Sequence, residues 1–135
     1  AGCHYDGHHF RIWKDFRFES ALHLEQAGAE DRRRQLHGHS YLTRLHIQAP
    51  LDTVYGWTID YGDVKARFKP LLAQLDHHTL NQIKGLGIPS TAQLANWMQQ
   101  QLAVALPELD RIDCYEKNGC GSVLSWANEG PALPI

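Results

Sequence analysis

The chain has 135 residues, of which 43% are hydrophobic and 21% charged, a balance typical of a single globular domain. Its formal net charge of -2 argues against a nucleic-acid partner or an anionic membrane surface, because both attract basic proteins. No apolar run has the length of a membrane span, and Cys3, Cys114 and Cys120 form no C-x-x-C pair. We therefore expect one domain over residues 1–135 in a reduced, cytoplasmic setting.

The first half of the chain predicts two long strands separated by a polar loop. Hydrophobic and polar residues alternate from Phe10 to Leu22 and again from His37 to Ala49. This alternation is typical of antiparallel strands with one buried face. Residues 24–36 between them are polar and charged, which indicates a loop.

Two helices are predicted next. Asp60 and Asp63 suit the first turn of one helix, and Pro70 within its apolar stripe predicts a kink or a break. Ser90 suits the N-cap of a second helix, with Gln93 three residues later as its capping-box partner. The apolar faces consist of Val64, Phe68, Leu71, Leu72 and Leu75 in the first helix and Leu94, Trp97, Met98, Leu102 and Ala105 in the second.

Two short strands complete the expected elements. They run from Arg111 to Glu116 and from Ser122 to Ala127, and Gly119 and Gly121 supply the turn between them. The order strand, strand, helix, helix, strand, strand predicts an α+β fold. We expect an antiparallel four-stranded sheet with two helices packed on one face.

The second predicted strand begins with His37-Gly38-His39. Residues i and i+2 of a strand project from the same face, so the two imidazoles can reach one zinc ion. His23, at the end of the preceding strand, is the candidate third ligand of a catalytic site that keeps one position open. The simpler alternative is a pair of hydrogen-bonded strand histidines without a metal.

A second candidate site follows the first helix, in the segment Leu75-Asp76-His77-His78. A histidine with a carboxylate partner is a suitable proton carrier near neutral pH, which makes His77 and Asp76 candidate catalytic residues. A surface loop with solvated histidines explains the same residues without catalysis.

Glu116 shares its predicted strand face with Ile112 and Cys114. A carboxylate on an apolar face is costly unless something pairs with it. A ligand with two adjacent N–H donors, such as the edge of a pterin or guanine, would satisfy Glu116 in bidentate fashion. Alternatively, the strand end reaches solvent at this point.

Taken in order, these segments resemble the pyruvoyl- and carboxy-tetrahydropterin synthase family. H-G-H alone is a weak motif, whereas H-G-H, then D-H-x-x-L-N, then a late strand Glu form a specific pattern. The matching segments span residues 18 to 116 and are Phe18-Glu19-Ser20-Ala21, His37-Gly38-His39-Ser40-Tyr41, Gly56-Trp57-Thr58-Ile59-Asp60-Tyr61, Leu75-Asp76-His77 with Leu80-Asn81, Pro89-Ser90 and Tyr115-Glu116.

The resemblance implies a tunnelling fold (T-fold) and a homohexamer built as a dimer of trimers. It implies a lyase that uses Zn2+ to act on 7,8-dihydroneopterin triphosphate or a related dihydropterin. The product is 6-carboxytetrahydropterin, which feeds 7-deazapurine and queuosine synthesis, or 6-pyruvoyltetrahydropterin. By the same matching, His37 and His39 bind the zinc with His23 as third ligand, His77 with Asp76 carries protons, and Glu116 anchors the pterin ring.

The chain departs from the family pattern at the two positions where the chemistry is most demanding, and in a smaller way at Ala92-Gln93, where the family often has Glu-Asn. The first zinc histidine of the family falls on Leu22, so binding by His23 requires a β-bulge or an early strand end. The family cysteine that carries a second proton falls on Arg33, which stays protonated and cannot act as a base. Some relatives in the family place a Glu in this loop instead of the cysteine, and Glu30 is the nearest candidate for it. The alternative function is therefore a catalytically impaired paralogue that binds a pterin or zinc without turnover.

Overall fold

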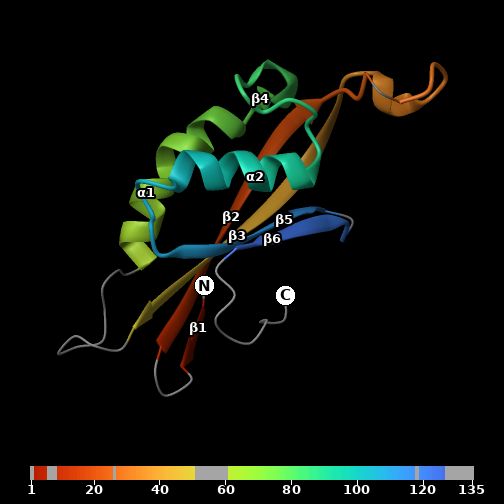
Figure 1. Cartoon of the computed structure of the whole chain (residues 1–135). Helices are drawn as coiled ribbons and strands as arrows, with labels where there is room; N and C mark the ends of the chain where they lie inside the picture. The colour runs from red at the N-terminus through yellow and green to blue at the C-terminus, as the bar shows by residue number, and fades with distance from the viewer. Residues whose placement is uncertain (1, 6–8, 26, 51–60, 118, 127–135) are drawn as a thin grey trace.

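The computed structural model describes residues 2–5, 9–25, 27–50, 61–117 and 119–126. Its helices lie on one face of a six-stranded sheet (Figure 1), which confirms the predicted α+β class. In chain order the elements are β1 (Gly2–Tyr5), β2 (His9–Leu22), the 3-10 turn η1 (Arg32–Arg34), β3 (His37–Pro50), α1 (Tyr61–Leu75), β4 (His78–Thr79), the 3-10 turn η2 (Leu80–Gln82), α2 (Thr91–Leu102), β5 (Leu109–Glu116) and β6 (Gly121–Ser125).

The sheet has two more strands than the four predicted from the sequence. The strands follow the order β1-β2-β3-β5-β6, and β4 pairs with β2 off this path. The β2–β4 pair is parallel, whereas the other pairs are antiparallel. The extra strands β1 and β4 have 4 and 2 residues, too few for an alternating pattern to reveal them in the sequence.

β2 and β3 form the long centre of the sheet. All 14 residues of β2 pair with β3, from His9 opposite Pro50 to Leu22 opposite His37. Residues that lie directly opposite each other in such a pair point to the same face. The two histidines of the His37-Gly38-His39 segment therefore share the helix-covered face with Leu22 and Ser20.

The hydrophobic core lies between the helices and this face of the sheet. The predicted apolar faces of both helices are buried, except that Leu72 is only half-buried and Ala105 lies beyond α2 and is exposed. The rings of Phe16 on β2 and Phe68 on α1 are 4.4 Å apart between centroids. α1 continues as one helix through Pro70, so of the predicted kink or break, the break does not occur.

The other sequence signals of the helices and of the last hairpin are largely met. The Ser90 side chain accepts the backbone N–H of Gln93 at 3.1 Å and caps α2 as predicted. Gly119 turns the chain between β5 and β6 with a φ of 87°, a conformation that favours glycine. The expected cap at Asp60, and the matching segment 56–60, lie outside the described residues.

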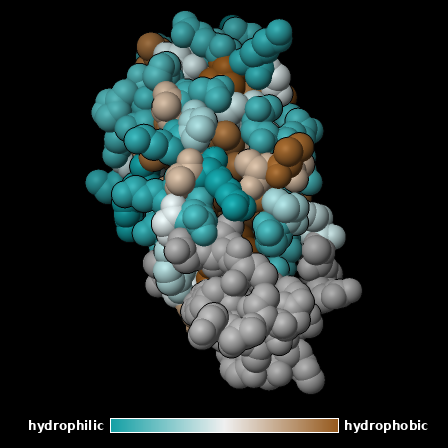
Figure 2. All heavy atoms as spheres, turned by 90° about the vertical axis from the view of Figure 1, so that its left-hand side faces the viewer, coloured by the Kyte–Doolittle hydropathy of each residue, from teal (hydrophilic) through white to brown (hydrophobic). Residues whose placement is uncertain are grey.

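No helix in the described part of the chain is long and apolar enough to span a membrane. The side of the molecule that carries α1 presents mainly hydrophilic atoms, with hydrophobic ones scattered between them (Figure 2).

Candidate active site

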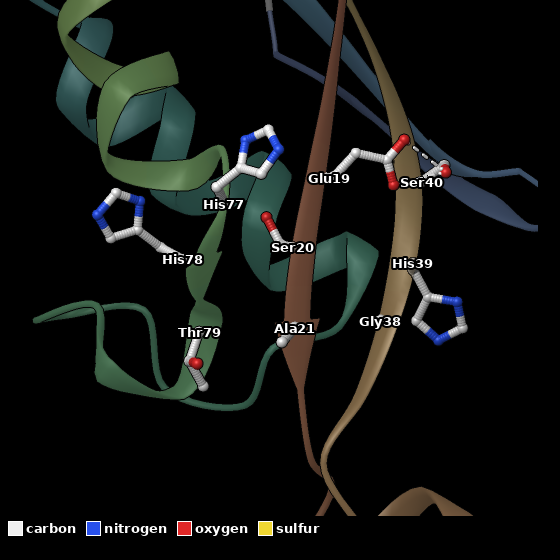
Figure 3. Close-up of a pocket in the computed structure, with 9 residues that line it drawn as sticks. All are labelled: Glu19, Ser20, Ala21, Gly38, His39, Ser40, His77, His78 and Thr79. Atoms are coloured by element: carbon white, nitrogen blue, oxygen red, sulfur yellow. Dashed lines mark hydrogen bonds between the residues drawn. The ribbon is translucent and has the colours of Figure 1, made fainter.

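The last residues of β2, the first residues of β3 and the turn after α1 lie around a cavity of about 420 Å³. α1 ends at Leu75, and the chain then turns into β4, which pairs with the last part of β2. Figure 3 shows β2 between β4 and β3 at this place. The residues that line the cavity are Glu19, Ser20, Ala21, Gly38, His39, Ser40, His77, His78 and Thr79.

Asp76 and His77 form the pair that the sequence predicted. The Nδ1 atom of His77 lies 3.0 Å from Oδ1 of Asp76 and donates a hydrogen bond to it, which leaves Nε2 for a ligand. The same Asp76 oxygen accepts the backbone N–H of Glu19 at 2.9 Å. The hydrogen bond from the Glu19 N–H is the largest cause that lowers the pKa of Asp76, and the bond from His77 lowers it further. Asp76 therefore stays ionised beside the imidazole.

The backbone holds His77 at the mouth of the cavity. Its N–H donates to the carbonyl oxygen of Glu19 at 2.6 Å, and its φ of 59° turns the chain from α1 toward β4. Leu75 and Leu80 on either side of this turn are fully buried. The buried leucines anchor the turn, while the His77 side chain is 78% exposed and open to a ligand.

His37 and His39 lie together, as predicted. Their ring centroids are 4.8 Å apart and the rings are nearly perpendicular. The Nδ1 atom of His37 is 2.8 Å from the carbonyl oxygen of Gln35, so Nδ1 carries the proton and Nε2 keeps its lone pair. A metal-binding histidine is commonly oriented by such a bond from its second nitrogen. This pair fits two ligands of a metal ion.

His23 is not brought into that pair. β2 ends at Leu22, and Asn81 bonds both the N–H and the carbonyl oxygen of His23 at 2.9 Å. The His23 ring has its Nδ1 atom 3.9 Å from the Glu25 carboxylate. Leu22, which lies opposite His37, is buried in the core. In the chain segments that the structure describes, no group of three His, Cys, Asp or Glu side chains is placed to hold a metal ion.

Glu116 ends β5 at the edge of a second cavity, which has a volume of about 600 Å³. Its partner across the sheet is Tyr41, whose buried hydroxyl has no hydrogen-bond partner among the described residues. Burial, and then the negative charge of Glu116, raise the pKa of Tyr41. The second cavity is lined by Arg17, Glu19, Ser40, Tyr41, Leu42, Tyr115, Glu116, Lys117 and Gly119.

Glu19 and Ser40 line both cavities. They are opposite each other in the β2–β3 register, and the Ser40 hydroxyl lies 2.7 Å from each carboxylate oxygen of Glu19 (Figure 3). Sequence reasoning gave Glu19 no role of its own. The signal that identifies it is the pairing register of two strands, which periodicity within either strand does not contain.

The loop between β2 and β3 contains the position of the expected cysteine. Arg33 lies in η1, where its guanidinium group binds the Asp31 carboxylate at 2.6 Å and its side chain is 63% exposed. Arg34 donates to the carbonyl oxygens of Glu25 and Ala27. Neither arginine lines either cavity, so both are accounted for by the structure of a charged loop.

Comparison with known proteins gives both a family and a fold. A family model described as 6-pyruvoyl tetrahydropterin synthase matches residues 11–125. A 6-carboxy-5,6,7,8-tetrahydropterin synthase of Synechocystis is 34% identical over 111 residues, which are 78% of this chain and 84% of that protein. A dihydroneopterin monophosphate aldolase of Pyrococcus furiosus is 27% identical over 95 residues, or 68% of this chain and 80% of that protein. The structure of 6-pyruvoyl tetrahydropterin synthase from Caenorhabditis elegans has a TM-score of 0.76 at 15% identity and covers 88% of this chain and 96% of that one, which confirms the predicted T-fold.

Proposed function

Because the chain belongs to the 6-pyruvoyl tetrahydropterin synthase family, we propose that it is a zinc-dependent lyase that acts on a dihydropterin. The proposed substrate is 7,8-dihydroneopterin triphosphate or a close relative. The proposed product is 6-carboxytetrahydropterin, in the 7-deazapurine and queuosine pathway, with 6-pyruvoyltetrahydropterin as the second candidate. The carboxy-forming reaction is favoured by the 34% identity to a synthase of that kind.

The observation that carries this proposal is the Asp76–His77 pair at the cavity that His39 also lines. A carboxylate on Nδ1 fixes the tautomer of the imidazole and stabilises its protonated form. The exposed Nε2 atom of His77 then takes a proton from the ligand, or returns one to it. Glu116 holds the pterin ring through two N–H donors of the ring.

The proposed metal ligands are His37, His39 and His23. The first two fit a metal ion, because their rings are adjacent and His37 keeps its Nε2 atom free. His23 follows the last residue of β2, where the alternation of the strand no longer fixes the direction of its ring. A bound Zn2+ would supply Lewis acidity to the hydroxyl groups of the substrate side chain.

Metal removal and reconstitution test this function. We expect protein purified without chelator to contain about one zinc per chain and to change the ultraviolet spectrum of 7,8-dihydroneopterin triphosphate as the pterin is converted. Chelation should abolish the conversion, and added Zn2+ should restore it. Fully metal-loaded protein that converts no dihydropterin would contradict the proposed enzyme.

The alternative is a paralogue that binds a pterin or zinc without turnover. It is favoured by buried Leu22 at the position of a family zinc ligand and by Arg33 outside both cavities. Under this alternative, the wild-type protein binds the pterin but releases it unchanged.

Replacement of Glu116 tests the proposed pterin anchor under both functions. Glu116→Ala removes a bidentate, charge-assisted contact and should weaken pterin binding on the order of tenfold to a hundredfold. Lys69→Gln, on the exposed side of α1, is the control and should bind as the wild type does. Calorimetric titration measures both, and unchanged affinity in Glu116→Ala would show that the anchor is wrong.

A further inference from the structure

Tyr41 lies between the histidine pair of β3 and the carboxylate that is proposed to hold the pterin ring. It follows His37 and His39 at alternate positions of β3, and its ring centroid is 6.0 Å from that of His39. On the neighbouring strand β5, Glu116 lies directly opposite Tyr41. Alternate residues of a strand point to one face, and so do residues directly opposite each other in a pair. His39, Tyr41 and Glu116 therefore share the helix-covered face of the sheet.

The hydroxyl group of Tyr41 is buried without a partner. The residue is 2% exposed, and its hydroxyl oxygen has no hydrogen-bond partner among the described residues. The ring itself is well packed, because it stacks on that of Phe18 with centroids 5.0 Å apart. A buried hydroxyl that makes no hydrogen bond costs free energy, so such groups are uncommon in folded proteins. The phenol ring is thus accounted for by the core, whereas its hydroxyl is not.

Glu116 is the charged group closest in the sheet register to this hydroxyl. It is near enough for its negative charge to act on the hydroxyl, although the two groups are not hydrogen-bonded to each other. Both residues also line the second cavity. A ligand held at Glu116 therefore brings its own polar atoms next to an unpaired hydroxyl group.

We propose that Tyr41 is a second pterin-binding residue, whose hydroxyl donates a hydrogen bond to the ring edge that Glu116 holds. This inference rests on the proposed function, because it needs a pterin at Glu116. The edge of a pterin places a carbonyl oxygen beside its two N–H donors. An ionised carboxylate only accepts hydrogen bonds, whereas a tyrosine hydroxyl is protonated at neutral pH and can donate one. Glu116 then binds the two N–H groups, and Tyr41 binds the carbonyl oxygen next to them.

Tyr115 provides a matched control on the other face of the sheet. It precedes Glu116 in β5, and its hydroxyl is likewise buried without a partner among the described residues. Its partner across the sheet is Leu42, whereas that of Glu116 is Tyr41, so the Tyr115 side chain points away from the helices. The two tyrosines carry the same unpaired group, and only Tyr41 shares a face with Glu116.

Thermal unfolding of Tyr41→Phe separates ligand binding from a structural role of the hydroxyl. Phenylalanine keeps the ring and its stack on Phe18 and removes only the hydroxyl group. Because this hydroxyl is unpaired in the free protein, we expect the unfolding temperature of Tyr41→Phe to equal or exceed that of the wild type. Tyr115→Phe should behave in the same way. A hydroxyl that instead bonds a buried water molecule would make Tyr41→Phe unfold at a lower temperature.

Calorimetric titration with neopterin measures the contribution of the hydroxyl to binding. Neopterin carries the pterin ring without the triphosphate leaving group, so binding is measured apart from turnover. We expect zinc-loaded Tyr41→Phe to bind it roughly fivefold to fiftyfold more weakly than the wild type, because the carbonyl oxygen of the ligand loses its donor. Tyr115→Phe should bind neopterin as the wild type does.

The outcomes distinguish this inference from the proposed function. Wild-type affinity in Tyr41→Phe, combined with weaker binding in Glu116→Ala, would overturn the role of Tyr41 and leave the pterin anchor standing. A lower unfolding temperature of Tyr41→Phe, or an equal loss of affinity in Tyr115→Phe, would show that the hydroxyl is structural and would also overturn that role. A zinc-loaded wild type that binds no pterin would overturn both the inference and the proposed function.

Discussion

His77 combines an unfavourable backbone conformation with an exposed side chain. Its φ of 59° lies in the left-handed region, which costs a residue with a side chain about 1–2 kcal/mol. The hydrogen bond of its N–H to Glu19 and the contact of its ring with Asp76 offset this cost. Strained residues of this kind collect at functional sites, so the conformation supports a role for the imidazole rather than for the turn.

The variant His77→Gly tests the effect of His77 on stability separately from its effect on turnover. Because glycine adopts a positive φ freely, His77→Gly should leave the free energy of unfolding unchanged or raise it by up to about 1 kcal/mol, while turnover falls. His78→Gly, one residue later in β4, is the matched control and should lower the free energy of unfolding by about 0.5–1 kcal/mol. Urea denaturation measures the free energy of unfolding of both variants. A marked loss of stability in His77→Gly would show that the backbone of His77 is not strained.

At the scale of the elements, the pairing of β3 with β5 assembles a buried charged cluster on the sheet face away from the helices. Asp113 is fully buried and lies 3.0 Å from Nε2 of His46 and 2.8 Å from Nε of Arg111. Burial by itself raises the pKa of Asp113, but the hydrogen bonds from His46 and Arg111 outweigh it and lower the pKa overall. The charge is therefore kept because both partners surround it.

Asp113→Asn should lower the free energy of unfolding by about 3–5 kcal/mol, since it removes the buried carboxylate that both His46 and Arg111 bond. A folded pKa below the unfolded value of about 3.9 means that this stabilisation is present above that pH and is lost as the pH falls through the folded pKa. The variant should thus lose less stability than the wild type on acidification below about pH 4.

The control for this cluster is Asp15→Asn, which removes the partner of Arg44 in a partly exposed ion pair. Water screens such a pair, so the expected loss is about 0–1 kcal/mol. Urea unfolding at neutral and acidic pH measures both variants. Equal losses of stability in the two variants would mean that burial does not strengthen the contribution of the Asp113 cluster.

At the scale of the whole molecule, the sheet ends in two short edge strands. β1 and β6 are the outer strands of the main path, and on β6 the side chain of Val123 is 47% exposed. An edge strand offers unpaired N–H and carbonyl groups to another chain. These features support the expected homohexamer, in which the sheets of neighbouring subunits would join, and that assembly stays a prediction.

Native mass spectrometry should detect a species near six times the 15.3 kDa mass of this chain. Val123→Lys places a charge on the edge of β6 and should shift the mass distribution toward smaller species. Val104→Lys introduces the same change at a residue that is 94% exposed after α2 and should leave the assembly intact. A wild-type monomer, or an equal effect of the two lysines, would contradict assembly through this edge.

The sequence by itself determined the local features of this protein. Alternation within residues 10–22 and 37–49 identified the two long strands, and residues 111–116 and 122–127 around a glycine turn identified two short ones. The apolar stripes identified the two helices and their buried faces. The predicted Asp76–His77 contact and the shared face of His37 and His39 also formed. These features could be predicted from the sequence because periodicity and short spacings are properties of neighbouring residues.

Only the tertiary structure decided how distant segments meet. Glu19 bonds Asp76 across 57 residues and Ser40 across 21, and neither spacing leaves a periodic trace in the sequence. The short strands β1 and β4, the helix through Pro70, and the placement of His23 apart from the histidine pair have the same origin. Each depends on packing or pairing with a segment remote in the chain, and the free energy of such contacts exceeds the local preference of a few residues.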